Sequence, residues 1–192
     1  MTTNCHFVVS GLPGSGKSTV ASAVARGLGL SLLDKDDFLE SLFEKKGVGD
    51  AQWRRKLSQD ADRKFIAEAM DSPGSVLVSW WRHPRSSVES GTQTDWLASL
   101  PGVIVEIYCR CGADIAARRF LERQRHPGHI DSRWSYTELL ASFSEQASLG
   151  PLSAGEILEI NTEREVDFDL LLALAKKSCE KTAGADKALQ RD

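Results

Sequence analysis

Apolar and polar residues follow two patterns that alternate along the chain. Short, nearly continuous apolar runs are separated by longer stretches in which apolar residues recur at helical spacing. Short runs of this kind are typical of strands buried inside a parallel sheet, and helices connect and cover such strands. The pattern therefore predicts an α/β fold with a parallel five-stranded sheet flanked by helices. The predicted strands are residues 6–10, 31–33, 76–79, 103–108 and 156–160.

The longer stretches predict helices with recognisable ends. The stretch from Lys17 to Leu28 is rich in alanine and valine, and Gly29 stops it. Asp114 is expected to cap a later helix, because aspartate is favoured at that position. The predicted helices are residues 17–28, 34–45, 51–70, 96–100 as the end of a helix, 114–123, 137–149 and 166–177, with a loop at 125–133.

Length and composition fit one soluble globular domain. The chain has 192 residues, of which 41% are hydrophobic and 27% charged. We expect the domain to span residues 1–177 and the charged segment 178–192 to be a disordered tail. A net charge of -3 disfavours, without excluding, a nucleic acid partner held by bulk electrostatics. No apolar run approaches the roughly 18 residues of a membrane span. We therefore expect a cytoplasmic protein without a membrane partner, and its oligomeric state stays open.

One segment carries the spacing G-x-x-x-x-G-K-S of a phosphate-binding loop. It follows an apolar strand and opens a helix, which is the context that this motif requires. Its glycines let successive N–H groups point at phosphate oxygens, and the helix directs its positive end there. Lys17 would add charge for the β and γ phosphates, and Ser18 a hydroxyl ligand for Mg²⁺. The predicted nucleotide cradle is Gly11, Leu12, Pro13, Gly14, Ser15, Gly16, Lys17, Ser18 and Thr19.

Acidic residues follow the second predicted strand. Asp34, Asp36 and Asp37 stand where that strand gives way to a helix. An alcohol that attacks a γ-phosphoryl group loses its proton during transfer, so a carboxylate must orient the hydroxyl and accept that proton. The same residues could instead cap the helix, where aspartate is favoured. Asp36 is the choice for the catalytic role, and the sequence leaves open whether one of its two neighbours is the base.

With these motifs the chain resembles the small P-loop kinases of the shikimate and gluconate kinase type. The run Leu33-Asp34-Lys35-Asp36-Asp37-Phe38 is similar to the D-x-D pattern after the second strand of those kinases. The resemblance implies a P-loop NTPase three-layer sandwich with a small lid at about 118–135. It also implies ATP with Mg²⁺ as phosphoryl donor, Asp34 in the metal shell and Asp36 facing the acceptor hydroxyl. Polynucleotide kinases show a basic residue and two acids here, which the run also matches.

The third predicted strand lacks the acid that many ATPases place at its end, because Ser79 leads into two tryptophans. This absence disfavours motor and transporter ATPases. Arg119 and Arg123 lie one helical turn apart and resemble lid arginines of the kinase group. An arginine fork can bind phosphate oxygens, and its plane can stack on adenine. The resemblance implies a nucleotide contact for Arg119 and a catalytic role for Arg123. A solvated basic face is the alternative, above all for Arg118 and Arg125.

The remaining candidates concern adenine and the acceptor. Asn161 ends the fifth predicted strand, where related kinases place the loop bordering adenine; ATP over GTP rests on this resemblance. Arg54 lies where shikimate kinases hold a substrate carboxylate, although an ordinary exposed arginine fits equally well. Trp80 and Arg82 follow the third strand, at the sheet edge where ligands of open α/β folds collect, or they pack the core. These residues indicate a small hydroxylated acceptor; the sequence leaves open whether it is anionic and does not name it.

The predicted function is an ATP-dependent kinase that transfers the γ-phosphoryl group to a hydroxyl of a sugar, a sugar acid or a similar small molecule. Two alternatives stay open. One is a nucleoside or polynucleotide 5′-hydroxyl kinase, which the basic residue before two acids and the tryptophans support. The other is a non-enzymatic nucleotide-dependent regulator, which the phosphate loop alone supports.

Overall fold

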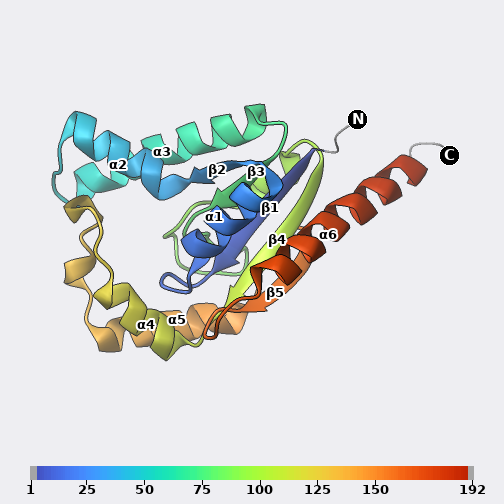
Figure 1. Ribbon diagram of the computed structural model, residues 1–192. Helices are drawn as coiled ribbons and strands as arrows, with labels where there is room; N and C mark the ends of the chain where they lie inside the picture. The colour runs from blue at the N-terminus through green and yellow to red at the C-terminus, as the bar shows by residue number, and fades with distance from the viewer. Residues whose placement is uncertain (1–3, 190–192) are drawn as a thin grey trace.

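The computed structural model describes residues 4–189 and has the α/β architecture that the sequence pattern predicts. All strands are parallel and form one sheet in the order β2-β3-β1-β4-β5 (Figure 1). Because β1 is the central strand, the loop after it opens at the middle of the carboxyl edge of the sheet. The strands are β1 (Cys5–Gly11), β2 (Ser31–Asp34), β3 (Ser75–Val78), β4 (Val103–Arg110) and β5 (Glu156–Asn161). The α-helices are α1 (Lys17–Leu28), α2 (Lys35–Lys46), α3 (Ala51–Asp71), α4 (Ala113–Glu122), α5 (Tyr136–Leu149) and α6 (Phe168–Leu189).

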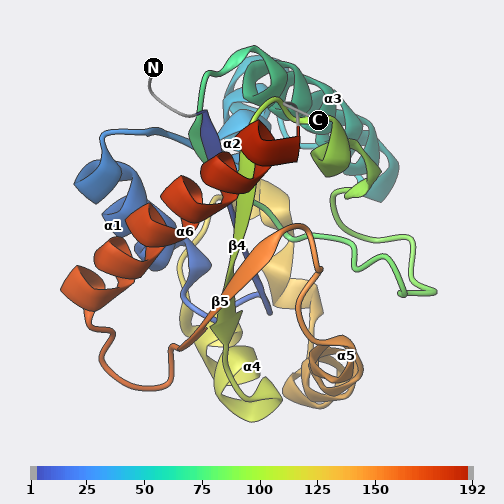
Figure 2. The same cartoon turned by 90° about the vertical axis from the view of Figure 1, so that its right-hand side faces the viewer.

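Helices cover both faces of the sheet and complete three layers. Phe7 and Val9 of β1 pack in one cluster with residues of α1 and α6, which lie side by side (Figure 2). Val8, between them, packs on the other face with Phe65 of α3 and with Leu97. Successive strand residues point to opposite faces, so a strand covered on both sides is apolar throughout. This burial is the reason why short apolar runs predicted the strands.

Two helix pairs border the carboxyl edge of the sheet, and a lid segment joins them. Helices α2 and α3 pack through a buried cluster that includes Phe43 and Leu57. Helices α4 and α5 pack through Phe120 and Phe143, whose ring centroids lie 5.8 Å apart. The segment between α4 and α5 reaches across to the end of α2 (Figure 1). There the His126 ring stacks on Phe43, with 5.2 Å between the centroids.

Three local expectations differ from the structure. The predicted helix end at 96–100 is a short 3-10 helix, η1 (Asp95–Ser99), and the predicted loop at 125–133 contains two more, η2 (Pro127–His129) and η3 (Asp131–Arg133). Asp114 does not cap α4, because Gly112 occupies the N-cap position. The Asp114 carboxylate instead accepts hydrogen bonds from Arg118, one turn later in α4, and from Tyr136, whose bond joins α4 to α5.

The last helix extends beyond its predicted end at residue 177. Ser178 is 5% exposed and Cys179 packs against the core cluster beneath α6, so apolar contacts continue past Lys177. The structure has α6 up to Leu189, where the sequence analysis expected a disordered tail; residues 190–192 of that tail lie outside the described residues. None of the helices within residues 4–189 is both long and apolar enough to cross a membrane.

Candidate active site

The phosphate-binding loop joins β1 to α1 in backbone conformations that glycine adopts most readily. Gly11, Gly14 and Gly16 have φ angles of 126°, 81° and 86°. A Cβ atom at Gly14 would lie 2.3 Å from the carbonyl oxygen of Ala116. Ser15 Oγ is buried and finds no hydrogen-bond partner within the described part of the chain. A tightly curled loop with an unsatisfied buried hydroxyl fits a phosphate chain, whose oxygens would accept from it.

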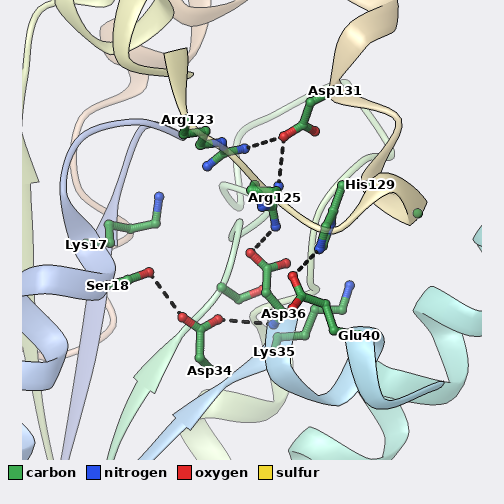
Figure 3. Close-up of polar contacts among 12 residues, drawn as sticks. Lys17, Ser18, Asp34, Lys35, Asp36, Glu40, Arg123, Arg125, His129 and Asp131 are labelled. Atoms are coloured by element: carbon green, nitrogen blue, oxygen red, sulfur yellow. Dashed lines mark hydrogen bonds and ion pairs between the residues drawn. The ribbon is translucent and has the colours of Figure 1, made fainter. Parts of the chain in front are cut away.

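The Lys17 side chain folds back over this loop (Figure 3). Its Nζ donates to the carbonyl oxygens of Gly11 at 3.0 Å and Leu12 at 2.8 Å. The residue is only 8% exposed. Burial lowers the pKa of Lys17 to about 8. A desolvated ammonium of this kind would bind the charged oxygens of a triphosphate more strongly than it binds carbonyl groups.

Ser18 and Asp34 connect the phosphate loop to the end of β2. Ser18 Oγ donates to Oδ2 of Asp34 at 3.1 Å, and Oδ1 accepts from the backbone N–H of Asp36 at 3.0 Å. Asp34 is therefore also the N-cap of α2. Burial, with the charges of Asp36 and Asp37, raises the pKa of Asp34 to about 6. This adjacent hydroxyl and carboxylate fit Mg²⁺, which takes oxygen ligands and completes its shell with phosphate and water.

Asp36 lies in the first turn of α2 and faces the lid (Figure 3). Its Oδ2 accepts a hydrogen bond from Nη2 of Arg125. Burial alone would raise the pKa of Asp36, but the positive charge of Arg125 and of neighbouring basic groups holds it below its ordinary value. Asp36 is therefore ionised at neutral pH, which is the state in which it can accept a proton.

Arg123 and Arg125 converge on a single carboxylate of the lid. Oδ2 of Asp131 accepts from Arg123 at 3.2 Å and from Arg125 at 3.3 Å. The Arg123 guanidinium also lies over the ring of Phe120, 4.0 Å from its centroid. Its Nε is buried and unpartnered among the described residues. Arg123 thus keeps one guanidinium donor from which no group in the described part of the chain accepts.

Further contacts dock the lid on α2 and α3. His129 Nε2 and Glu40 Oε1 lie 2.7 Å apart, and burial lowers the pKa of His129. Arg54 Nε donates to the carbonyl oxygen of Gly128 at 3.1 Å. Arg54 is therefore a half-buried residue at the lid and not an ordinary exposed arginine of α3.

Arg119 and Asn161 lie near the loop that follows β5. Arg119 Nη1 donates to the carbonyl oxygen of Thr162 at 3.0 Å. Asn161 Oδ1 accepts from the backbone N–H of Glu163 at 2.9 Å. A Cβ atom at Gly16 would lie 3.9 Å from Cβ of Thr162, so this loop borders the phosphate loop. The structure thus brings Arg119 and Asn161 to one loop beside the phosphate loop, and their contact with adenine stays a prediction.

Trp80 and Arg82 line a separate small cavity of about 60 Å³ between the phosphate loop and α5. Trp80 Nε1 donates to Oε1 of Gln146 at 3.1 Å, and Arg82 donates to the carbonyl oxygen of Glu89. The adjacent Trp81 is a core residue. Asp36 and Arg54 do not line this cavity. The structure thus divides the predicted acceptor residues between two places.

Sequence analysis missed three residues of the site: Glu40, His129 and Asp131. The ion pair between Arg125 and Asp36 joins residues 89 positions apart, as does the contact between His129 and Glu40. Local patterns carry no information at that separation. The available signal was Asp131 itself, a single acid within a segment otherwise rich in arginine and histidine.

A phosphate loop after the central strand of a 2-3-1-4-5 parallel sheet, acids after β2 and an arginine-bearing lid define the P-loop kinase class of α/β proteins. The chain belongs to the family described as an AAA domain, whose model matches residues 7–137. This match confirms the family resemblance and the fold that the sequence analysis predicted.

The individual relatives are similar to this chain only at low sequence identity. The chain is 25% identical to the cytidylate kinase of Pyrobaculum islandicum over 170 residues, which cover 86% of this chain and 82% of the relative. A solved structure from Chloroflexus aurantiacus, provisionally described as a kinase, has a TM-score of 0.71 at 24% identity, covering 92% and 99% of the two chains. A gluconokinase from Sinorhizobium meliloti has a TM-score of 0.52 at 15% identity and full coverage of both. The two structural likenesses concern the fold alone.

Proposed function

We propose that this chain is an ATP-dependent phosphotransferase that moves the γ-phosphoryl group to a hydroxyl of a small molecule. One observation carries the proposal: the phosphate loop, the Ser18–Asp34 pair and the Asp36–Arg125 pair surround one site (Figure 3). These parts correspond to a triphosphate cradle, a metal shell, a base and a charge-stabilising lid, which are the parts that phosphoryl transfer needs.

The residues divide the reaction between them. The loop N–H groups and Lys17 hold the phosphates of ATP, while Asp36 orients the acceptor hydroxyl and takes its proton. The acceptor oxygen then bonds to the γ-phosphorus as the bond to the β-phosphate oxygen breaks, and ADP leaves. Mg²⁺ at Ser18 and Asp34 would neutralise charge on the phosphates. Arg123 would stabilise the negative charge that develops on the transferred group.

Asp36 must exchange partners before it can act. In the structure its Oδ2 accepts from Arg125, so an acceptor hydroxyl has to enter beside or in place of that guanidinium. Arg54, Arg123 and Arg125 all lie in this region, and Arg54 is the one of the three that forms no ion pair with a carboxylate among the described residues. An acceptor with a carboxylate or phosphate group near its hydroxyl would balance that charge. We therefore favour an anionic alcohol, such as a sugar acid.

A second candidate function is transfer to the phosphate of a nucleotide. The similarity to cytidylate kinases, at 25% to 26% identity over 85% to 86% of the chain, favours it. The arginines would suit a nucleotide phosphate equally well. The two candidates differ in their need for a base, because a phosphate acceptor is already ionised at neutral pH whereas an alcohol must lose its proton.

An acceptor screen tests the proposal. ADP formation from ATP and Mg²⁺ would be measured with sugar acids, sugars, nucleosides, cytidine monophosphate and 5′-hydroxyl oligonucleotides. We expect a hydroxylated small acid to stimulate ADP formation and to appear as a phosphate ester. Stimulation by cytidine monophosphate alone would select the second candidate, and stimulation by oligonucleotides a polynucleotide kinase. ATP binding with no stimulation by any acceptor class would support a nucleotide-dependent regulator.

A further inference from the structure

A line of buried and half-buried polar contacts runs from the start of α2 to the end of β3. Lys35, the first residue of α2, is 8% exposed, and its Nζ lies 3.4 Å from Oδ1 of Asp62 in α3. The same Oδ1 accepts from Oγ1 of Thr92 at 2.7 Å. Ser79, directly after β3, has its Oγ 2.6 Å from Oγ1 of Thr92. Three segments distant in sequence therefore meet at Asp62.

The donor and the acceptor of each hydrogen bond along this line can be assigned. An ionised carboxylate only accepts, so Thr92 gives its single hydroxyl proton to Asp62. Ser79 must then donate to the oxygen of Thr92. Ser79 and Thr92 are 5% and 1% exposed, so water has little access to replace a lost bond between them. On the other side Lys35 donates to Ser58 at 2.7 Å as well as facing Asp62.

Thr92 also closes the loop that follows β3. Its N–H donates to the carbonyl oxygen of Trp80 and its own carbonyl accepts from the N–H of Arg82, each at 2.8 Å. Gly91 has φ of 95°, and a Cβ there would lie 2.7 Å from the Trp80 carbonyl oxygen. The base of the loop 81–91 is therefore fixed through Thr92, and the cavity residues Trp80 and Arg82 are fixed with it.

We propose that Asp62 is a positioning residue that couples the loop 81–91 to the catalytic carboxylates. The inference rests on the proposed function. Lys35 stands between Asp34 and Asp36 in the chain, so holding Lys35 in place holds the backbone of both carboxylates. Because one oxygen of Asp62 faces both Lys35 and Thr92, a displacement of the loop is transmitted to the first turn of α2. Asp62 acts through these neighbours and touches neither nucleotide nor acceptor.

The test compares variants of Asp62 with a matched control on the same helix. Asp62→Ala removes both contacts, Asp62→Asn keeps the shape but not the charge, and Asp62→Glu keeps the charge. The control is Asp60→Asn, because Asp60 is paired with Lys46 and Arg63 at the surface. Trypsin cleavage after Arg85 reports loop opening without any acceptor. Steady-state kinetics with ATP and the acceptor found in the screen measure how far a change in the loop affects catalysis.

We expect Asp62→Ala to accelerate cleavage after Arg85 by about tenfold, as expected for loss of a charged hydrogen bond. Its kcat should fall on the order of 10-fold to 10²-fold through misplacement of the carboxylates, with the KM for ATP unchanged. Asp62→Glu should recover part of the loss, and Asp60→Asn should change neither quantity.

Two results would overturn the inference. One is a loop that Asp62→Ala leaves as resistant to trypsin as in the parent chain. The other is faster cleavage with the parent kcat, since the loop would then be free without consequence for catalysis. If Asp62→Ala fails to fold, the near-isosteric Asp62→Asn decides by the same two readouts. A parent chain that phosphorylates no acceptor would instead contradict the proposed function, and this failure appears before any variant is compared.

Discussion

Lys17 combines a desolvated charge with weak hydrogen-bond partners. The residue is 8% exposed and its ammonium is hydrogen-bonded to two backbone carbonyls, so the charge contributes little to the fold that a neutral side chain could not replace. We expect Lys17→Met to lower phosphoryl transfer by at least about 10²-fold while thermal stability stays close to that of the parent. Turnover and melting temperature, measured together, check this outcome. Lys45→Met, at an exposed position of α2, is the control and should leave turnover unchanged.

The raised pKa of Asp34 predicts that the stability of the fold decreases as the pH rises and this carboxyl group ionises. Its pKa is raised to about 6 by burial and by neighbouring acids, above the ordinary value of 3.8. A raised carboxyl pKa means that ionised Asp34 destabilises the fold above pH 6, and that this cost disappears as pH falls toward 4. The cost is at most about 3 kcal/mol.

Asp34→Asn should therefore raise the melting temperature at pH 8 by a few degrees in magnesium-free buffer, since asparagine can still cap α2. The gain should shrink steadily between pH 6 and pH 4. Thermal unfolding of both proteins over this pH range makes the comparison. An equal difference at all pH values would mean that the raised pKa of Asp34 is not the cause.

At the scale of elements, the lid is a segment between α4 and α5 that brings arginines over α2. Arg123 has a buried donor without a partner in the described residues and lies two positions before Arg125, which pairs with Asp36. We expect Arg123→Ala to reduce kcat on the order of 10²-fold and ATP affinity much less, because its charge acts on the transferring group. Steady-state kinetics beside binding of a non-hydrolysable ATP analogue separate the two effects.

Arg118→Ala is the matched control, because Arg118 is a largely exposed arginine of α4 that pairs with Asp114. It should change neither kcat nor affinity. Equal losses of kcat in the two variants would mean that the lid arginines form a solvated basic face and that Arg123 has no specific catalytic role.

The elements differ in how far sequence could predict them. Strands such as β1 were predictable because both their faces are buried, which leaves a continuous apolar run. Helix α1 and the phosphate loop were predictable because every contact that defines them is local. The segment near residue 100 was predicted less well, because it is a short 3-10 helix, η1. Its Leu97 packs on α3, and a tertiary contact of this kind leaves no local pattern. Likewise, α6 continues beyond its predicted end at residue 177, because Ser178 is buried there.

The same physical distinction governs the site. Sequence indicated Asp34 and Asp36 because they directly follow a strand, where ligands of parallel sheets collect. It gave no indication that Arg125 would pair with Asp36, or Asp62 with Lys35, since each pair is assembled by the packing of separate elements. It also grouped Trp80 and Arg82 with Asp36, whereas the structure gives them their own cavity beside α5.

At the scale of the whole molecule, the fold brings the phosphate loop from β1, the acids from β2 and α2, and the arginines from the lid to one edge of the sheet (Figures 1 and 3). Asp36 lies where these parts meet. The central claim is that this assembly transfers a phosphoryl group to an alcohol and that Asp36 accepts the proton.

The most direct test measures acceptor phosphorylation and ATP-analogue binding for Asp36→Asn at saturating Mg²⁺. Asparagine preserves the size of the side chain but cannot accept the hydroxyl proton. We expect turnover to fall on the order of 10² to 10⁴, with analogue binding unchanged. Full turnover in Asp36→Asn would contradict the account, because the acceptor would then need no base at this position.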